Sequence, residues 1–211
     1  MTKTIVYLTR HGQTEWNLVR KMQGFQDSPL TELGILQAAW LRDALLDIEM
    51  TALYSSTSQR AIKTAEIIRA KRPLEILTYD AFREIDMGDW EGKTIDEIQQ
   101  IDAQSLDIFL RDPTEYVPTN HGESFYDLQH RVVPVLDQII ERHPDQTIMI
   151  VSHGITLKLM LAHFEQRPLA QLWNPPFLQP TALSKVVIED SVTTLELNGD
   201  TTHYKEIEIH T

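Results

Sequence analysis

Short apolar runs alternate along most of the chain with longer segments whose apolar residues recur every three or four positions. The short runs are typical of strands that are covered on both faces. We expect such strands at residues 4–9, 51–55, 74–79 and 147–151. The longer segments predict helices, because a spacing of three to four residues places apolar side chains on one helix face.

Polar capping residues mark where several helices should begin. Thr31 can cap a helix that runs to about residue 47, and residues 56–58 offer caps for a helix through about residue 70. Thr94 and Glu97 have the spacing of a capping box, in which each residue binds the backbone of the other. These signals predict helices directly after the second strand and near residue 95.

The clearest helical pattern precedes the fourth strand. A buried stripe along one helix face is predicted from the three- to four-residue spacing of Phe125, Leu128, Val132, Val135 and Ile139. Pro134 lies inside this stripe, and because proline lacks an N–H we expect it to kink or interrupt the helix. A further helix is predicted over residues 154–164.

The remaining segments complete the predicted fold. From about residue 181 the chain has the pattern of strands, with Asn198-Gly199 as a turn signal, and residues 111–120 predict a surface loop. Alternating strands and helices indicate the α/β class. We expect a three-layer α/β/α sandwich with a mostly parallel central sheet and an antiparallel addition from the tail. Because no linker or repeat interrupts the chain, we expect one domain over residues 1–211.

Composition excludes several classes of function. The chain has 19 Lys and Arg against 31 Asp and Glu, a formal net charge of −12. That charge opposes nucleic-acid binding and attraction to an anionic membrane, since both need a basic surface. A small anionic substrate is not excluded, because a few local arginines outweigh a distant field that salt screens. The absence of cysteine excludes disulfides, thiolate metal sites and cysteine nucleophiles.

Hydropathy bears on location. The N-terminal segment reaches Arg10 before a signal-peptide core could form, and no apolar run approaches the roughly 20 residues of a membrane helix. We therefore expect a soluble, cytoplasmic protein with no membrane or nucleic-acid partner. The sequence leaves the oligomeric state open.

One pattern occurs twice: a buried strand, a small hydroxyl residue and a His-Gly dipeptide close behind it. The two dipeptides are His11-Gly12 and His153-Gly154. Ligands of open α/β sheets bind beyond the carboxyl ends of the strands, so we expect both histidines at one site. The glycines let the backbone turn and let a ligand approach closely.

Two arginines are expected at the same edge. Arg60 falls in the first turn of the helix after the second strand, where free N–H groups and the helix dipole favour an anion. Arg10 adjoins His11, and the planar guanidinium fork matches phosphate oxygens. A lone His-Gly pair is usually only a turn, and an arginine early in a helix is usually solvated. The hypothesis of a phosphoryl site therefore depends on the convergence of Arg10, His11, Arg60 and His153.

An acidic loop follows the third predicted strand. Its carboxylates are Glu84, Asp86, Asp89 and Glu91. Loop carboxylates mostly face solvent, but one that lies beside an aromatic such as Trp90 would be desolvated and could hold a proton as a general acid. Large aromatics lie more often in the core than in a pocket, and the candidates for a pocket wall are Trp16, Trp90 and Trp173.

Together these segments resemble the histidine phosphatase superfamily, which includes the cofactor-dependent phosphoglycerate mutases. The stretch from Leu8 to Asn17 resembles the family's RHG signature. Further matches, in order, are Gln23-Gly24, Asp27 to Thr31, Ser55-Ser56 with Arg60, Glu84 with Gly88 to Gly92, Gly122 to Ser124, and Ser152 to Gly154. They span residues 5–155, about three quarters of the chain. The resemblance is greatest to the bacillus-type broad-specificity phosphatases, whose likeness includes Trp173 to Pro176.

The resemblance implies a phosphoric monoester hydrolase that acts on small phosphorylated substrates without a cofactor. It implies that His11 is the nucleophile, and that Glu84 protonates the leaving alcohol and then activates water. The phosphate oxygens would be surrounded by Arg10, Arg60 and His153. The implied substrate contacts are Asn17, Gln23, Gly24 and the Gly154 backbone. His11 and Glu15 have the spacing of a helical metal pair, but Gly12 and the family pattern favour a loop, so we expect no metal site.

Departures from the family pattern narrow the function. Family members often have Glu where this chain has Gln13, outside the implied phosphate shell. The mutases carry a longer insertion after the acid and an adjacent arginine pair that grips the substrate carboxylate, whereas residues 92–120 contain only Arg111. A phosphatase is therefore favoured over a mutase. A pathway-specific enzyme such as an α-ribazole phosphatase is a further alternative, as is a silent phosphate-binding module, which would be expected to lose His11 or Glu84.

Overall fold

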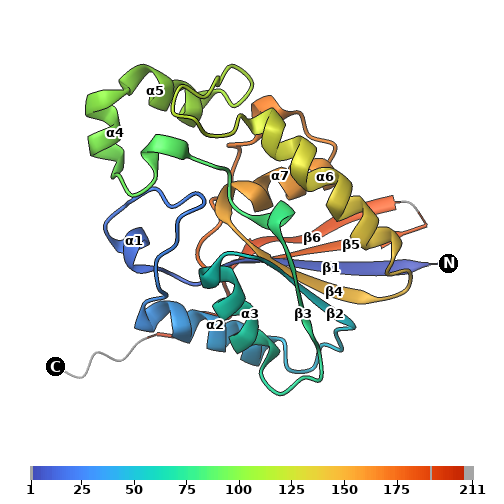
Figure 1. The fold of residues 1–211 in the computed structure, drawn as a ribbon. Helices are drawn as coiled ribbons and strands as arrows, with labels where there is room; N and C mark the ends of the chain where they lie inside the picture. Colours follow the sequence, from blue (N-terminus) through green and yellow to red (C-terminus); the bar gives the residue numbers. More distant parts are fainter. Residues whose placement is uncertain (1, 191, 207–211) are drawn as a thin grey trace.

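The computed structural model describes residues 2–190 and 192–206. Its centre is a six-stranded sheet with the strand order β3-β2-β4-β1-β5-β6 (Figure 1). The strands are β1 (Lys3–Arg10), β2 (Ala52–Ser56), β3 (Ile76–Tyr79), β4 (Thr147–Ser152), β5 (Leu183–Glu189) and β6 (Val192–Asp200). β1, β2, β3 and β4 pair in parallel, while β5 pairs antiparallel with β1 and β6. Of the strands described, β5 alone runs against the others.

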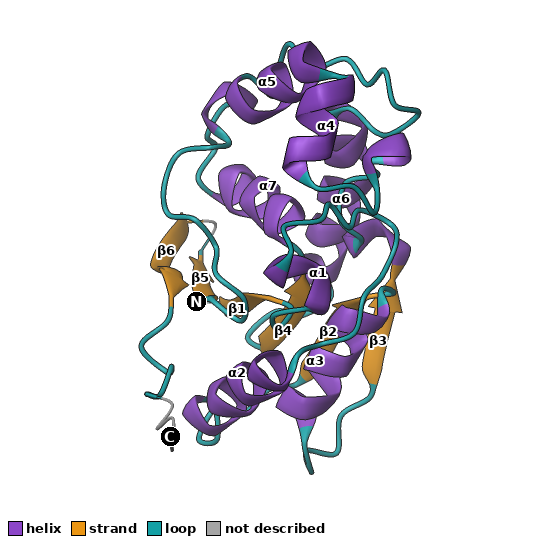
Figure 2. Ribbon diagram, turned by 90° about the vertical axis from the view of Figure 1, so that its left-hand side faces the viewer, coloured by secondary structure: helices purple, strands orange, loops and turns teal. Residues whose placement is uncertain are grey.

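Helices cover both faces of this sheet, as Figure 2 shows. The long helices are α2 (Glu32–Ala44) and α3 (Gln59–Arg69) on one face, and α6 (Phe125–Glu141) and α7 (Gly154–Phe164) on the other. Side chains of β1 alternate between the two cores: Tyr7 packs with the α2 and α3 side, while Val6 and Leu8 pack on the opposite side. The predicted α/β class and three-layer architecture are confirmed.

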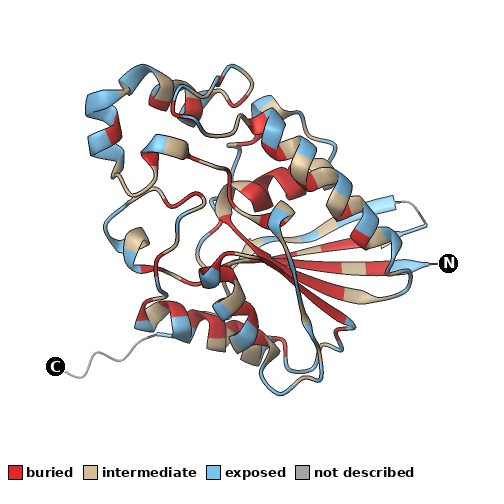
Figure 3. Cartoon of the chain, viewed as in Figure 1, coloured by how far each residue is buried: buried red, intermediate tan, exposed pale blue. Residues whose placement is uncertain are grey.

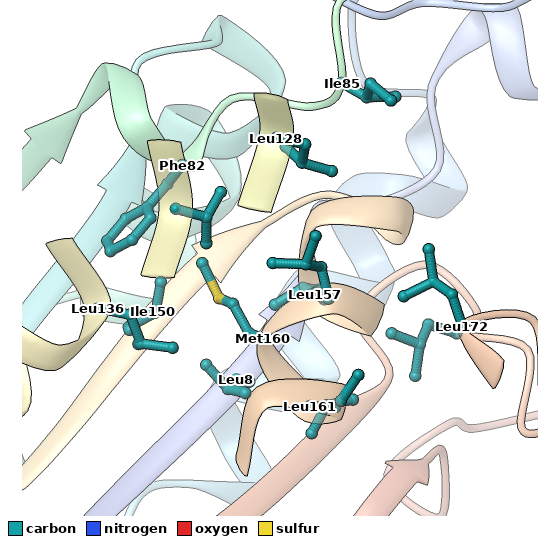
Figure 4. Packing of buried hydrophobic residues seen from close by; sticks show 14 of the residues in the cluster. Leu8, Phe82, Ile85, Leu128, Leu136, Ile150, Leu157, Met160, Leu161 and Leu172 are labelled. Carbon is teal, nitrogen blue, oxygen red and sulfur yellow. The ribbon is translucent and has the colours of Figure 1, made fainter. Parts of the chain in front are cut away.

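The larger core lies between the sheet and helices α6 and α7. Figure 4 shows Leu8 of β1 and Ile150 of β4 near Leu157 and Met160 of α7, all at most 2% exposed. Figure 3 shows that α7 is buried along most of its length. Although α7 is apolar on nearly every side, no helix in the described residues is long and apolar enough to cross a membrane. Close packing makes α7 a rigid support for groups at its first turn.

Smaller elements lie beyond the carboxyl ends of the parallel strands (Figure 1). They are α1 (Glu15–Leu18), α4 (Ile95–Ile101) and α5 (Ala103–Arg111). Three short 3₁₀ helices also occur, at Asp80–Phe82, Gly88–Trp90 and Leu169–Gln171. The capping box of Thr94 and Glu97 is confirmed at the start of α4. Residues 111–120 are not simply a surface loop, because Tyr116 is 3% exposed and packs against Trp90 and Phe109.

Pro134 does not interrupt the helix, so that part of the prediction is wrong. Helix α6 continues from Phe125 to Glu141 with Pro134 inside it, on the exposed side. The buried stripe also differs at one position: Leu136 is buried, whereas Val135 is only partly covered. A step of four residues from Val132 keeps the stripe in phase with 3.6 residues per turn, and a step of three brings Ile139 to the same face.

The turn predicted at Asn198-Gly199 is also wrong, since both residues lie inside β6. β5 ends at Glu189 and β6 begins at Val192, so the chain reverses earlier. Gly199 has a φ of +72° and donates from its N–H to Ser184 Oγ at 3.0 Å, close to a register shift in the β5–β6 ladder. Gly199 therefore allows an irregularity within the sheet and does not form a turn, because glycine adopts a positive φ without strain.

Candidate functional site

The two histidines of the repeated pattern lie side by side at the carboxyl edge of the sheet. β1 and β4 are parallel neighbours, and Arg10 pairs with Ser152 in their register. The next residues, His11 and His153, therefore leave the sheet together, with ring centroids 5.2 Å apart. Their predicted meeting at one site is confirmed.

The His11 ring has a defined tautomer. Nδ1 lies 2.7 Å from the Gly12 carbonyl oxygen, which can only accept, so Nδ1 carries the proton and Nε2 carries the lone pair. Gly12 is fixed in turn, because its N–H donates to Thr64 Oγ1 at 3.0 Å. A Cβ at Gly12 would lie 2.4 Å from the Gly34 carbonyl oxygen, so only glycine fits there. Within the described structure no hydrogen bond occupies Nε2 of His11.

Burial keeps both imidazoles neutral. It lowers the pKa of His11 well below the ordinary value of 6.5, and the charges of Arg60 and Arg10 lower it further. The hydrogen bond to Gly12 acts in the opposite direction but is the smaller effect. Burial, followed by the charge of Arg60, lowers the pKa of His153 in the same way. An imidazole that is neutral at pH 7 is a competent nucleophile.

Arg60 is 1% exposed and lies in the first turn of α3. Its Nη1 donates to Asp27 Oδ1 at 3.0 Å, and its Nη2 donates to the Gly24 carbonyl at 2.9 Å. Burial lowers its pKa and the carboxylate of Asp27 raises it, but a guanidinium stays charged in proteins. Nε of Arg60 is buried and has no partner among residues 2–190 and 192–206. It is therefore a charged donor that an anion would satisfy.

Arg10 presents a second guanidinium, on a partly buried side chain. Its Nη1 donates to the Leu178 carbonyl at 2.9 Å, while Nε is buried and has no partner in the described part of the chain. Burial lowers its pKa, and the nearby carboxylate of Glu84 raises it. Two cations, each with a buried and unsatisfied Nε–H, make this edge of the sheet strongly attractive to an anion.

Glu84 is held at the first turn of α7. Its carboxylate accepts from the N–H of Thr156 at 3.0 Å, from the Thr156 hydroxyl at 3.0 Å and from the N–H of Ile155 at 3.1 Å. A Cβ built on Gly154 would lie 3.7 Å from Arg10 Nε and 3.8 Å from Glu84 Oε2. Glu84, Arg10 and the start of α7 therefore converge, although 70 residues separate Glu84 from Gly154 in sequence.

These groups form the floor of one cavity of about 340 Å³. The predicted site residues that line it are Arg10, His11, Asn17, Gln23, Gly24, Arg60, Glu84 and Gly154. The apolar wall consists of Met22, Met87, Ile95, Phe109, Leu110, Ile155, Trp173 and Phe177, with Arg20 and Lys21 completing the lining. The cavity is thus cationic at its floor and mostly apolar above it.

His153 lies behind this cavity wall, because its ring is fully buried beside His11. Its Nε2 is 2.8 Å from Ser56 Oγ, and Nδ1 has no partner in the structure as described. Ser56 ends β2, the other neighbour of β4, so three adjacent strands contribute to the site.

Of the three candidate tryptophans, only Trp173 lines the cavity. Trp90 is 1% exposed and packs against Phe109 and Tyr116, so it belongs to the core. The idea that Trp90 forms the wall beside a proton-donating carboxylate is therefore wrong. The aromatic cluster that α5 brings to Trp90 explains the difference, because the sequence pattern did not predict α5.

The predicted substrate contacts retain unused polar groups. Asn17 Oδ1 accepts from the Thr14 N–H and hydroxyl, both at 3.0 Å, which leaves the Asn17 amide N–H groups for a ligand. Gln23 is 7% exposed, and its Oε1 is buried with no partner in the described residues.

Comparison with protein-family models identifies the family, because one model matches nearly the whole chain. The model described as "Histidine phosphatase superfamily (branch 1)" matches residues 6–201. The chain belongs to the histidine phosphatase superfamily. It is therefore an enzyme that acts on phosphate esters, as both the family and its phosphatase relatives show.

Relatives of this histidine phosphatase carry both phosphatase and mutase names. The chain is 32% identical over 208 residues to the "Probable phosphoglycerate mutase GpmB" of Proteus mirabilis, covering 96% of this chain and 95% of that protein. It is 31% identical over 167 residues to "Phosphoserine phosphatase 1" of Hydrogenobacter thermophilus, covering 79% of each. Among solved structures, Bacillus stearothermophilus YhfR superposes with a TM-score of 0.91 at 44% identity, covering 95% of this chain and 98% of that one.

Sequence reasoning gave no role to Glu91, although this histidine phosphatase uses it to shape the site. Its carboxylate accepts from the N–H groups of Phe25, Gln26 and Met87. Burial raises its pKa, while those three hydrogen bonds act in the opposite direction. The loop that it holds supplies the carbonyls bound by Arg60. The family match over Gly88 to Gly92 includes Glu91 and was the available signal. The loop that Glu91 binds, however, lies 65 residues away at Gln26.

We expect Glu91→Ala to lower the free energy of unfolding by about 1–3 kcal/mol, because it leaves the part-buried N–H groups of Phe25 and Met87 unpaired. It should also lower kcat/KM, since the carbonyls that orient Arg60 would move. Chemical denaturation and steady-state kinetics measure the two effects. The control is Glu66→Ala, which removes an exposed carboxylate from α3 and should change stability by no more than about 0.5 kcal/mol. Equal behaviour of the two variants would contradict the role given to Glu91.

In the part of the chain that the structure describes, no group of three or more His, Asp and Glu side chains is arranged to hold a metal ion.

Proposed function

We propose that this enzyme is a metal-independent phosphomonoesterase that hydrolyses small phosphorylated metabolites through a phosphohistidine on His11. The observation that supports this most directly is a neutral imidazole with a free Nε2 in a cavity that also holds two guanidinium groups with buried, unpaired Nε–H groups. A phosphate ester would satisfy those donors and place its phosphorus beside the imidazole lone pair.

In the first step Nε2 of His11 attacks phosphorus and the bond from phosphorus to the ester oxygen breaks. Glu84 donates its proton to that oxygen, so the product leaves as a neutral alcohol. The positive charge that develops on the ring is stabilised by the Gly12 carbonyl, which accepts from Nδ1. Arg10 and Arg60 bind the phosphoryl oxygens, together with His153, whose Nδ1 has no partner in the described structure.

In the second step a water molecule attacks the phosphoryl group of the phosphohistidine. Glu84, now a carboxylate, takes a proton from that water while the bond from phosphorus to nitrogen breaks. Phosphate leaves, and both His11 and Glu84 return to their starting protonation states. Asn17, Gln23, Gly24 and Gly154 position the substrate around these groups.

The wall formed by residues 92–120 favours a phosphatase over a phosphoglycerate mutase. This segment contributes Ile95, Phe109 and Leu110 to the cavity. Its one arginine, Arg111, pairs instead with exposed Asp107 on the same helix. This segment therefore offers apolar side chains where the mutases are expected to present an arginine pair.

The extent of the site supports one catalytic domain over residues 1–211. The cavity is built by segments between β1 and the loop before β5, and β5 and β6 complete the sheet that carries it. The cytoplasmic location stays a prediction.

A phosphatase screen tests the proposed function. Purified enzyme is offered sugar phosphates, phosphoglycerates, nucleotides and aryl phosphates, with and without EDTA, and phosphate release is measured alongside a coupled mutase assay. We expect hydrolysis that EDTA does not reduce. Complete loss with chelator would contradict metal independence, and dominant isomerisation would favour the mutase. Binding of phosphate without turnover of any ester would favour the silent module.

A further inference from the structure

We propose that Lys158 binds a carboxylate of the substrate, at the end of its alcohol moiety that is farthest from the phosphate. The binding place is a side cavity that joins the phosphate site at Gly154. The inference rests on the proposed phosphomonoesterase function and specifies its substrate class: phosphate monoesters whose apolar skeleton carries a distal carboxylate.

The side cavity has a volume of about 410 Å³ and shares a wall with the catalytic cavity. The shared residues are Leu110, Gly154, Trp173 and Phe177. Gly154 lies beside Arg10 Nε and Glu84 Oε2, so the catalytic groups and the side cavity meet at a position that has no side chain. The other lining residues of the side cavity are Lys158, Pro175 and Leu178. Lys158 is therefore the one charged side chain on its wall among the described residues.

Lys158 is a buried cation without an acidic partner. It is 8% exposed, and its ammonium donates to the carbonyl oxygens of Leu172, at 3.2 Å, and Asn174. An ammonium has three N–H groups, so these two contacts do not exhaust it. The acidic residue near it, Glu165, pairs with Arg167 at 2.9 Å. Burial lowers the pKa of Lys158, and a bound carboxylate would oppose that shift.

The position of Lys158 on α7 sets the reach of the substrate. It follows Gly154 by four residues, a distance of about 6 Å along the helix. Side chains on a helix lean toward its N-terminus, so the Lys158 side chain lies over the turn that begins at Gly154. A substrate with its phosphate at His11 would pass Gly154 and the apolar wall before its carboxylate reached the ammonium. A rigid aromatic ring suits this passage better than a compact three-carbon acid.

Lys158 also has a structural role, because it holds the chain around Trp173 through two carbonyls. That role alone would make loss of the ammonium impair all substrates to the same degree. A specificity role would instead change the ratio between substrates that differ only in the distal charge. The ratio separates the two roles even where the variant is less stable.

The test compares kcat/KM for 4-carboxyphenyl phosphate with kcat/KM for the uncharged 4-carbamoylphenyl phosphate, and repeats the comparison with the 3-substituted isomers. We expect the wild-type enzyme to prefer the carboxylate in at least one pair, and Lys158→Met to lower that preference about tenfold or more, as for the loss of a charged hydrogen bond. Lys158→Arg should keep most of it. The matched control is Lys71→Met, at an exposed lysine, which should leave the ratio unchanged.

Two results would overturn the inference: a wild-type enzyme that hydrolyses both members of each pair equally well, or a Lys158→Met variant that loses both activities in equal proportion. The first needs no variant to fold. Either result would leave the proposed function standing, because hydrolysis of the aryl phosphates would still be observed. Failure to hydrolyse any of them would instead contradict the phosphomonoesterase itself.

Discussion

His11→Ala is expected to abolish turnover, with a loss in kcat on the order of 10⁶, as for removal of other covalent nucleophiles. The variant keeps both guanidinium groups, so it should still bind inorganic phosphate. It lacks the imidazole whose free Nε2 lies at the cavity. Loss of turnover with retained phosphate binding would separate chemistry from binding.

Rapid quenching with labelled substrate measures the covalent step. The wild-type enzyme should trap label on the protein that survives alkali and is lost in acid, which is the behaviour of a phosphorus–nitrogen bond. His11→Ala should trap none. His130→Ala removes an exposed histidine from α6 and serves as the matched control, with label and turnover unchanged. Full activity in the His11 variant would refute the nucleophile assignment.

The sheet was predictable because most of its strands are covered on both faces. The strand predicted over residues 147–151 became Thr147–Ser152, and the helix predicted over residues 154–164 is α7 itself. Their apolar runs are continuous, so neighbouring elements reinforce the local pattern. Leu136 shows the limit of prediction from the apolar pattern. Both Val135 and Leu136 fit a spacing of three to four residues, and packing against the sheet determines that Leu136 is the buried one.

Convergence of the four cationic and imidazole groups was predictable for a simple reason. Parallel strands end at one edge, so His11 and His153 had to emerge together once β1 and β4 were neighbours. Glu84 was different, because its carboxylate is fixed by the N–H groups of α7, about 70 residues away. Only the family resemblance selected it from four loop carboxylates. Glu91 was missed for the same physical reason, since its acceptor role depends on a distant loop.

Residues 92–120 were the least predictable part of the fold. α5 depends on an aromatic cluster that includes Trp90, Phe109 and Tyr116. Each aromatic is compatible with an exposed loop when taken alone, and each is buried because the others are present. This segment also forms the apolar wall of the catalytic cavity, so the part of the chain that bears on substrate choice is the part with the weakest local pattern.

Glu84→Gln should slow phosphoenzyme formation about 10²–10⁴-fold for alkyl phosphates such as glycerol phosphate, because glutamine cannot donate the proton that an alkoxide leaving group requires. It should form the phosphoenzyme from 4-nitrophenyl phosphate at close to the wild-type rate, since nitrophenolate leaves without protonation. Rapid-quench measurement of the first turnover gives both rates. Equal slowing for the two esters would contradict the acid role. Glu115→Gln, at an exposed carboxylate, is the control and should change neither rate.

The same proton predicts the pH dependence of the wild-type enzyme on alkyl phosphates. The first step needs a proton on Glu84, which favours hydrolysis at mildly acidic pH. Lowering the pH to mildly acidic values should not inactivate His11, because burial and the two arginines hold its pKa well below 6.5 and the imidazole stays neutral. We therefore expect greater activity at mildly acidic than at alkaline pH. A wild-type rate that rises steadily into alkali would oppose the proton-donor role.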